Sequence, residues 1–307
     1  MKPQLDNKVM SSMMLYVDHK VCKIGEAYTN HSGYLYESTP KYLYKDSSSN
    51  FFIYSSPHKQ LVADRSITGA HVSSGIFFET TLGSSHYPAD GITGPKLASI
   101  NHAQGQFYTR SPITQTGVIP RQSARYAVKD FNVYLTTMPE QDLIFETKIA
   151  LRPRVTNRVT GLAPHNQTYP AIFLKNIGSK NEPFAFGGID DTRFSVRAVI
   201  LSDNAFNLDA VCSILKDCAR DIVPIIENTD LPFDAVGGSP SGYNYEELAS
   251  SKIGSGLFLN VKDVVVSRNV GQSYASEENP AIQASFVDFD LSYHRKPADD
   301  SPRIAGY

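Results

Sequence analysis

Two pairs of aspartates are the residues whose type and spacing come closest to catalytic chemistry. Asp190 and Asp191 follow two glycines at 187 and 188, and Asp288 and Asp290 are two residues apart near the C-terminus. Paired carboxylates can bind a metal ion or divide the roles of general acid and general base. A hydrolase built on either pair is therefore one hypothesis for this chain.

The first pair lacks the other features of a phosphate-binding loop. No Lys-Ser/Thr follows the glycines, and residues 194–201 predict a strand rather than a helix whose N-terminus would bind phosphate. We expect residues 186–191 to form a turn, with glycines at positive φ and Asp190 and Asp191 bonded to nearby amides.

The second pair lies on one side of a predicted strand, because side chains alternate along a strand. Val287, Phe289 and Leu291 supply the apolar side, and Asp288 and Asp290 the polar side. This pattern is typical of a half-buried strand whose polar side faces solvent or basic groups of a neighbouring subunit.

Histidines and cysteines show no metal-binding pattern. The eight histidines form no HxH, HxxxH or HExxH motif, and Cys22, Cys212 and Cys218 include no CxxC pair and no disulfide framework. We expect no catalytic residue, no cofactor and no metal ion, and a reducing environment.

Composition narrows the class of partner. The 307 residues carry a net charge of −2, so no strong positive field favours nucleic acid, and no apolar run suggests a signal peptide or membrane span.

The chain has 17 Tyr and no Trp. Tyr suits packed interfaces. Five tyrosines in extended, turn-punctuated segments are candidate subunit-interface residues: Tyr34, Tyr36, Tyr42, Tyr44 and Tyr54. Ordinary packing within the chain is their alternative role.

The fold class we expect is α+β, mostly β. Residues 1–160 predict an antiparallel β-rich unit with a Tyr-rich extended N-terminal segment, a hairpin at 99–109 and a strand pair over 131–151. Met10, Met13, Met14 and Val17 also fit one face of a short helix. Residues 153–169 are polar and contain Pro and Gly, so they are the expected domain boundary.

Residues 161–307 predict an antiparallel sheet with one amphipathic helix, at about 205–222, packed on it. Asn204 or Asn207 is its expected N-cap. The strand face formed by Phe194, Val196, Ala198 and Ile200 is expected to contact the helix stripe at Leu208, Val211 and Leu215. Residues 295–307 read as a C-terminal arm.

Four segments resemble a group of tailed-bacteriophage virion structural proteins: residues 25–30, 126–134, 186–188 and 208–214. The layout of residues 170–294, a lone helix on a sheet followed by a long final strand, resembles neck and tail-terminator proteins. The resemblance implies a virion component without catalytic residues, made in the host cytoplasm and assembled with other virion proteins of the neck, tail tube or sheath.

We therefore expect a ring-forming neck, connector or tail-terminator protein that joins head and tail, with no specific nucleic-acid or membrane binding. Its candidate interface residues are the five tyrosines together with Asp190, Asp191, Asp288 and Asp290. The alternative is a baseplate or receptor-binding β-sandwich module, in which exposed tyrosines stack on sugar rings.

Overall fold

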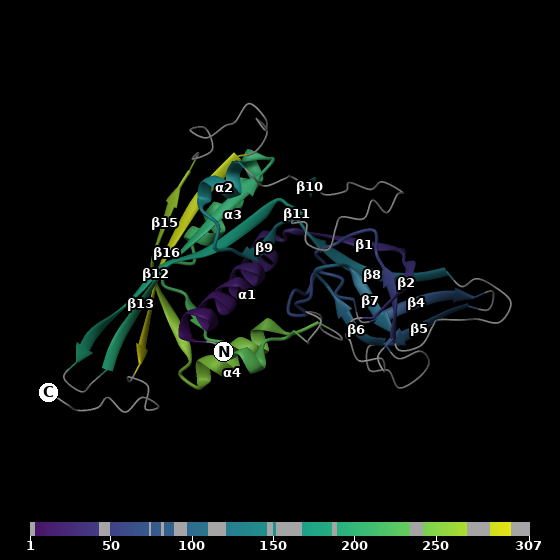
Figure 1. Cartoon of the computed structure of the whole chain (residues 1–307), viewed down its shortest axis with the longest axis horizontal. Coiled ribbons are helices and arrows are strands. Elements are labelled where there is room, and N and C mark those ends of the chain that lie inside the picture. The colour runs from purple at the N-terminus through teal and green to yellow at the C-terminus, as the bar shows by residue number, and fades with distance from the viewer. Residues whose placement is uncertain are drawn as a thin grey trace.

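The computed structural model shows two units side by side, an α+β unit on a six-stranded sheet and a β-sandwich (Figure 1). This confirms the expected fold class, α+β with mostly β. The structure describes residues 4–42, 50–73, 75–80, 83–88, 97–109, 121–145, 150–151, 168–185, 189–233, 242–268 and 283–295.

The strand that follows the double glycine lies near the centre of the six-stranded sheet. Its order is β14 (Ile222–Pro224), β15 (Phe258–Ser267), β16 (Gln283–Arg295), β13 (Ile189–Ser202), β12 (Ala171–Ala185) and β9 (Asn132–Leu135). Neighbouring strands are antiparallel except β9, which runs parallel to β12. The turn expected at 186–191 is corrected in part: residues 186–188 lie outside the described residues, but Asp190 and Asp191 belong to β13, because both pair with β12 and β16.

One face of this sheet is covered by α1 (Leu5–Gly25) and α3 (Ala205–Lys216). The contact predicted between the even-numbered face of β13 and the α3 stripe is confirmed, because both belong to one buried core. That core includes Phe194, Val196, Ala198, Ile200, Leu208, Val211 and Leu215, together with Val9, Met13, Val17 and Val21 of α1. The helix considered at the N-terminus is thus a long one, and it shares the core of the sheet.

The α3 helix begins where expected and ends earlier than residue 222. The Asn204 side chain caps it by accepting a hydrogen bond from the Phe206 amide at 2.8 Å. Beyond Lys216 the chain turns, with Arg220 at φ 73°, and Ile222 opens β14. Pairing with β15 satisfies the backbone there and overrides the helical spacing of the sequence.

The strand pair expected over 131–151 is wrong. Its first strand exists as β9 but pairs with β12, and residues 140–145 form the short helix α2 (Glu140–Phe145). Leu143 of α2 packs with Phe173 and Val199 on the second face of the sheet. β10 (Ala150–Leu151) pairs in parallel with β11 (Thr168–Tyr169).

The β-sandwich consists of two four-stranded antiparallel sheets that enclose a second core. One sheet has the order β1 (Tyr28–Tyr34), β8 (Arg121–Lys129), β4 (Gly75–Thr80) and β5 (Gly83–Pro88); the other has β2 (Tyr36–Tyr42), β3 (Asn50–Ser55), β7 (Gln106–Thr109) and β6 (Leu97–Asn101). Ile76 and Tyr126 from the first sheet pack with Tyr54, Ile100 and Phe107 from the second. The hairpin predicted at 99–109 is confirmed as β6 and β7.

The two units do not follow one another along the chain. The described strands from β1 to β8 form the sandwich, whereas α1 and β9 pack with the six-stranded sheet. The α+β unit is therefore assembled from both ends of the chain. It also contains the short 3₁₀ helix η1 (Asn228–Asp230) and α4 (Tyr245–Gly254), which the sequence pattern did not predict.

Candidate functional site

The second face of the six-stranded sheet carries three of the four candidate aspartates. Pairing of β13 with β16 sets Ser195 opposite Asp290, Arg197 opposite Asp288 and Asp191 opposite His294. Residues directly opposite in antiparallel strands share a face. We call this surface, beyond the part covered by α2, the open face.

Asp288 is engaged by an arginine. Arg197 holds it with two hydrogen bonds, Nε to Oδ1 at 2.6 Å and Nη2 to Oδ2 at 2.9 Å. The same guanidinium lies 3.4 Å from Glu140 of α2, whose other carboxylate oxygen lies 3.3 Å from Lys175 Nζ. This bidentate geometry gives positional specificity and ties α2, β12, β13 and β16 together.

Asp190 and Asp191 do not form a carboxylate pair, because neighbouring residues of β13 point to opposite faces. The Asp191 side chain is only 8% exposed, with Arg193 Nε 3.2 Å from Oδ2 and His294 Nδ1 3.5 Å from Oδ1. Asp190 is half-buried opposite Arg295 of β16. The structure therefore brings Asp191, Asp288 and Asp290 to one face and separates Asp190 from them.

Asp290 lies at a hollow of about 410 Å³ that Gly178, Ser179, Lys180, Arg193 and Ser195 also line. Asp263 of β15 stands opposite Asp290 across the strand pair. Like charges in that position repel. Lys180 and Arg193 in the same lining place opposite charges beside Asp290.

One large apolar side chain lies beside these charges: Phe184 of β12 is 60% exposed. The Phe184 ring lies 4.5 Å from the His294 ring. An exposed apolar residue within a charged surface is typical of the centre of a protein–protein contact.

The candidate tyrosines divide into exposed and buried residues. Tyr34 and Tyr36 are 45% and 43% exposed, at the link between β1 and β2. Tyr54 is 1% exposed and packs inside the sandwich, so its side chain serves the chain's own core. Tyr44 and the side chain of Tyr42 lie outside the described residues.

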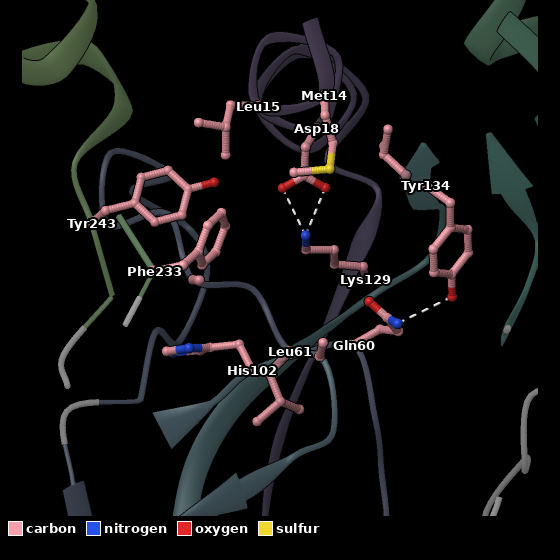
Figure 2. A pocket seen from close by; sticks show the side chains of 13 residues that line it. Met14, Leu15, Asp18, Gln60, Leu61, His102, Lys129, Tyr134, Phe233 and Tyr243 are labelled. Atoms are coloured by element: carbon pink, nitrogen blue, oxygen red, sulfur yellow. Dashed lines mark hydrogen bonds and ion pairs between the residues drawn. The ribbon is translucent and has the colours of Figure 1, made fainter. Parts of the chain in front are cut away.

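A cavity of about 340 Å³ lies at the junction of the two units (Figure 2). Met14 and Asp18 of α1 line it from one side, and His102 and Lys129 of the sandwich from the other. The sequence patterns did not point to this cavity, because its lining comes from six separate parts of the chain.

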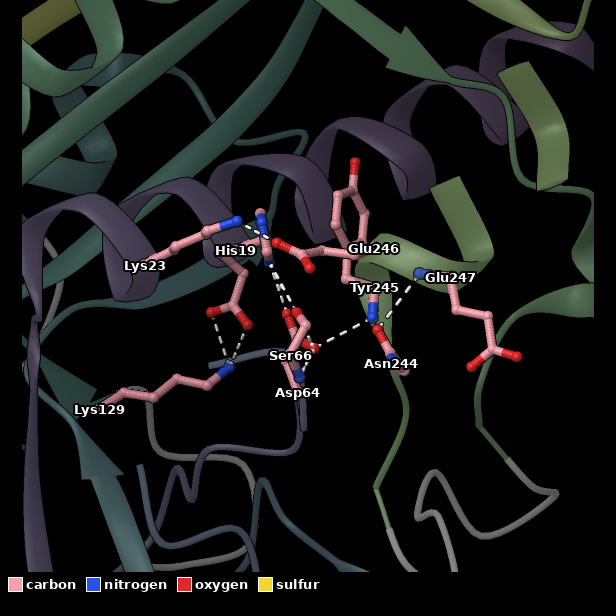
Figure 3. Close-up of polar contacts among 10 residues, drawn as sticks. His19, Lys23, Asp64, Ser66, Lys129, Asn244, Tyr245, Glu246 and Glu247 are labelled. Carbon is pink, nitrogen blue, oxygen red and sulfur yellow. Dashed lines mark hydrogen bonds and ion pairs between the residues drawn. The ribbon is translucent and has the colours of Figure 1, made fainter. Parts of the chain in front are cut away.

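A network of buried polar side chains also joins the units (Figure 3). Asp64 lies 2.7 Å from His19 Nδ1 and accepts hydrogen bonds from Ser66 and from the Tyr245 amide. Burial alone would raise the pKa of Asp64, but these hydrogen bonds outweigh it and hold the pKa below its ordinary value. In the sequence, the signal for this network is that Asp18 and His19 interrupt the apolar residues of α1.

Three comparisons with known proteins give no match: no family model, no curated protein and no solved structure is similar to this chain at a significant level. Among the described residues, no group of three or more His, Cys, Asp and Glu side chains is placed to hold a metal ion. The helices that the structure describes include none long and apolar enough to cross a membrane.

Proposed function

We propose that this chain is a structural component of a tailed-phage virion, which forms a ring at the neck, connector or tail terminator between head and tail. The observation that carries the proposal is the open face, where Phe184 stands exposed against His294, beside the charged pairs that Arg193 and Arg197 form with aspartates. Such a surface offers both apolar area and electrostatic selectivity to a partner.

A ring needs two different, complementary surfaces on each subunit. The C-terminal end of β12 and the N-terminal end of β13 lie at one end of the long axis of the molecule. β1 and β2 lie toward the other end (Figure 1). The first end carries Phe184 and the second carries Tyr34 and Tyr36. This arrangement supports head-to-tail contact between the open face of one subunit and the tyrosines of the next.

The choice of a virion rests on the resemblance of residues 25–30, 126–134, 186–188 and 208–214 to phage structural proteins. The proposal assigns no catalytic role to the aspartates, since Arg197 and Arg193 hold Asp288 and Asp191. It needs no cofactor. Its partners are the neighbouring virion proteins of the neck, tail tube or sheath, and its location is the virion after synthesis in the host cytoplasm.

Negative-stain microscopy and light scattering of the purified protein test this proposal. We expect rings of uniform size, with the mass of several chains. A protein that stays monomeric at its highest soluble concentration, and that is absent from purified virions, would overturn it.

A second candidate function is a receptor-binding or baseplate module, which the β-sandwich with its exposed Tyr34 and Tyr36 favours. Aromatic rings can stack on sugars, although Trp, which this chain lacks, presents a larger ring. Glycan-array binding that is lost in Tyr34→Ala/Tyr36→Ala, by a protein that stays monomeric, would favour this function over the ring.

A further inference from the structure

A groove between α1, α4 and β14 is independent of the open face, and we call it the α1–α4 groove. Its volume is about 370 Å³, which lies in the range of about 300–1,000 Å³ that small-molecule sites span. Ile222, Pro224, Ala249 and Ile253 form its apolar walls, and His19 of α1 also lines it. Ile222 and Ile253 are 45% and 37% exposed, so the groove is open to solvent.

A buried carboxylate fixes one nitrogen of the His19 ring. Nδ1 lies 2.7 Å from Asp64 Oδ2, and the Asp64 side chain is only 2% exposed. Ser66 Oγ and the Tyr245 amide donate to Oδ1 of the same carboxylate, at 2.7 Å and 3.0 Å. An ionised carboxylate can only accept, so Nδ1 of His19 carries the proton of their hydrogen bond. The His19 ring also stacks on the Tyr245 ring, with centroids 4.5 Å apart, which fixes its plane.

The second ring nitrogen of His19, Nε2, is open to solvent. Its ring contacts Asp64 and Ser66 through Nδ1, and among the described residues Nε2 itself has no hydrogen-bond partner. The Tyr245 hydroxyl is sealed from solvent without a partner, but His19 Nε2 is not among such sealed atoms. Nε2 therefore keeps accessible surface, and the α1–α4 groove is the hollow that His19 lines. Figure 3 shows this nitrogen pointing away from Asp64 and Ser66.

The charged side chains of the groove are already paired. Lys20 Nζ lies 2.7 Å from Asp221 Oδ2, which also accepts a hydrogen bond from the Tyr16 hydroxyl at 2.6 Å. Glu246 forms an ion pair with Lys23. These pairs leave the groove with little net charge to attract an ion. What it offers a ligand is apolar wall and, in the neutral imidazole ring, one fixed acceptor.

We propose that the α1–α4 groove binds a small, uncharged, mainly apolar molecule that donates one hydrogen bond to His19 Nε2, of the class of phenols and alcohols. Contacts with the apolar walls provide most of the affinity. The hydrogen bond selects for the donor, because Asp64 holds the ring in the tautomer whose Nε2 accepts.

Phenol and toluene are matched probes, because they share shape and differ in the donor. We would titrate each into the full chain labelled with ¹³C at the isoleucine δ1 methyls, at a pH where the ¹⁵N shift of His19 Nε2 shows it to be unprotonated. Ile222 and Ile253 line the groove and report binding, whereas the exposed Ile177 of β12 is the internal control. We expect both probes to shift the two reporters and not Ile177, with phenol binding about two- to tenfold more tightly.

The His19→Asn variant removes Nε2 and keeps an N–H donor at the position of Nδ1, where it can still bond Asp64. It should abolish the preference for phenol and retain toluene binding. The wild-type chain gives a test that does not depend on this variant folding: phenol, and not toluene, should move the ¹⁵N resonance of His19 Nε2.

Reporter methyls that neither probe shifts would overturn the proposal, and so would an Ile177 methyl that shifts as much as they do. An unmoved Nε2 resonance with phenol, or a phenol preference that persists in His19→Asn, would do the same. None of these outcomes bears on the proposed ring, which is tested by the mass of the assembly.

Discussion

The ammonium of Lys129 lies 2.7 Å from each carboxylate oxygen of Asp18, and this ion pair joins the end of β8 to α1. The two side chains are 14% and 9% exposed. Burial alone would lower the pKa of Lys129, but the Asp18 carboxylate outweighs it and the pKa lies above its ordinary value. The pair therefore stays charged while it connects the sandwich to the α+β unit.

Lys129→Met should destabilise the protein by about 3–5 kcal/mol, because it leaves the Asp18 carboxylate buried without a counter-charge. Urea unfolding of the purified variant measures this loss. The double variant Asp18→Leu/Lys129→Met should lose less than Lys129→Met alone, since no uncompensated charge remains.

Lys180→Met is the matched control for that experiment. Lys180 pairs with Glu182 on β12, and these side chains are 63% and 39% exposed. Solvent screens such a pair, so its removal should leave the midpoint of urea unfolding nearly unchanged. Equal losses for Lys129→Met and Lys180→Met would contradict a special role for the buried pair.

His102 gives stability a dependence on pH. Its pKa falls from 6.5 to about 4 in the folded chain, through burial and the nearby Lys129. Between these values the unfolded chain binds more protons at this ring, so the free energy of unfolding declines as the pH falls from 6.5 to 4. The contribution is present above pH 6.5 and amounts to about 3 kcal/mol.

The measurement compares the wild-type chain with His102→Leu by urea unfolding at several pH values. Between pH 6.5 and 4, the free energy of unfolding of the variant should fall by about 3 kcal/mol less than that of the wild type. The carboxylates of the chain titrate equally in both proteins. Parallel curves for the two proteins would show that His102 does not titrate as its burial implies.

Local patterns predicted the parts of the fold that depend on neighbours in sequence. The even-numbered face of β13 met the α3 stripe as expected, and Asn204 caps α3. These features follow from alternation and from capping chemistry, which a few consecutive residues determine.

Contacts between distant segments could not be predicted in the same way. β9 looked like half of a local hairpin, yet its partner is β12. Asp64 is held by His19 and by the Tyr245 amide, 45 and 181 residues away in sequence. The cavity and the junction network depend on such pairings, and a single sequence has no periodicity that records them.

Gly105 is a position where the predicted hairpin depends on one residue. Its φ is +63°, and a Cβ there would lie 2.0 Å from the His58 carbonyl oxygen. Gly105→Ala should therefore destabilise the protein by more than the 1–2 kcal/mol that the left-handed conformation alone costs. Thermal and urea unfolding measure the loss. Gly178→Ala is the control, because a Cβ there meets nothing within 4 Å, and a similar loss at both sites would refute the steric argument.

Phe184 gives the sharpest test of the proposed ring. Its exposed ring on β12 packs against the His294 ring in a tilted arrangement, at the end of the sheet opposite the start of α3. Phe184→Glu places a charge where the neighbouring subunit is proposed to pack, and loss of an interface aromatic typically weakens association by on the order of thirtyfold or more. Mass photometry should show rings replaced by single chains, with unchanged stability because the side chain is exposed.

Phe206→Glu is the matched control, since Phe206 is 78% exposed in the first turn of α3, which follows the end of β13 opposite to Asp190. It adds the same charge to the same residue type outside the proposed interface, and rings should persist. If Phe206→Glu dissolves the rings as readily as Phe184→Glu, general charge repulsion is the cause. If Phe184→Glu leaves them intact, the open face is not the contact surface, and the ring, if present, is built on other parts of the chain.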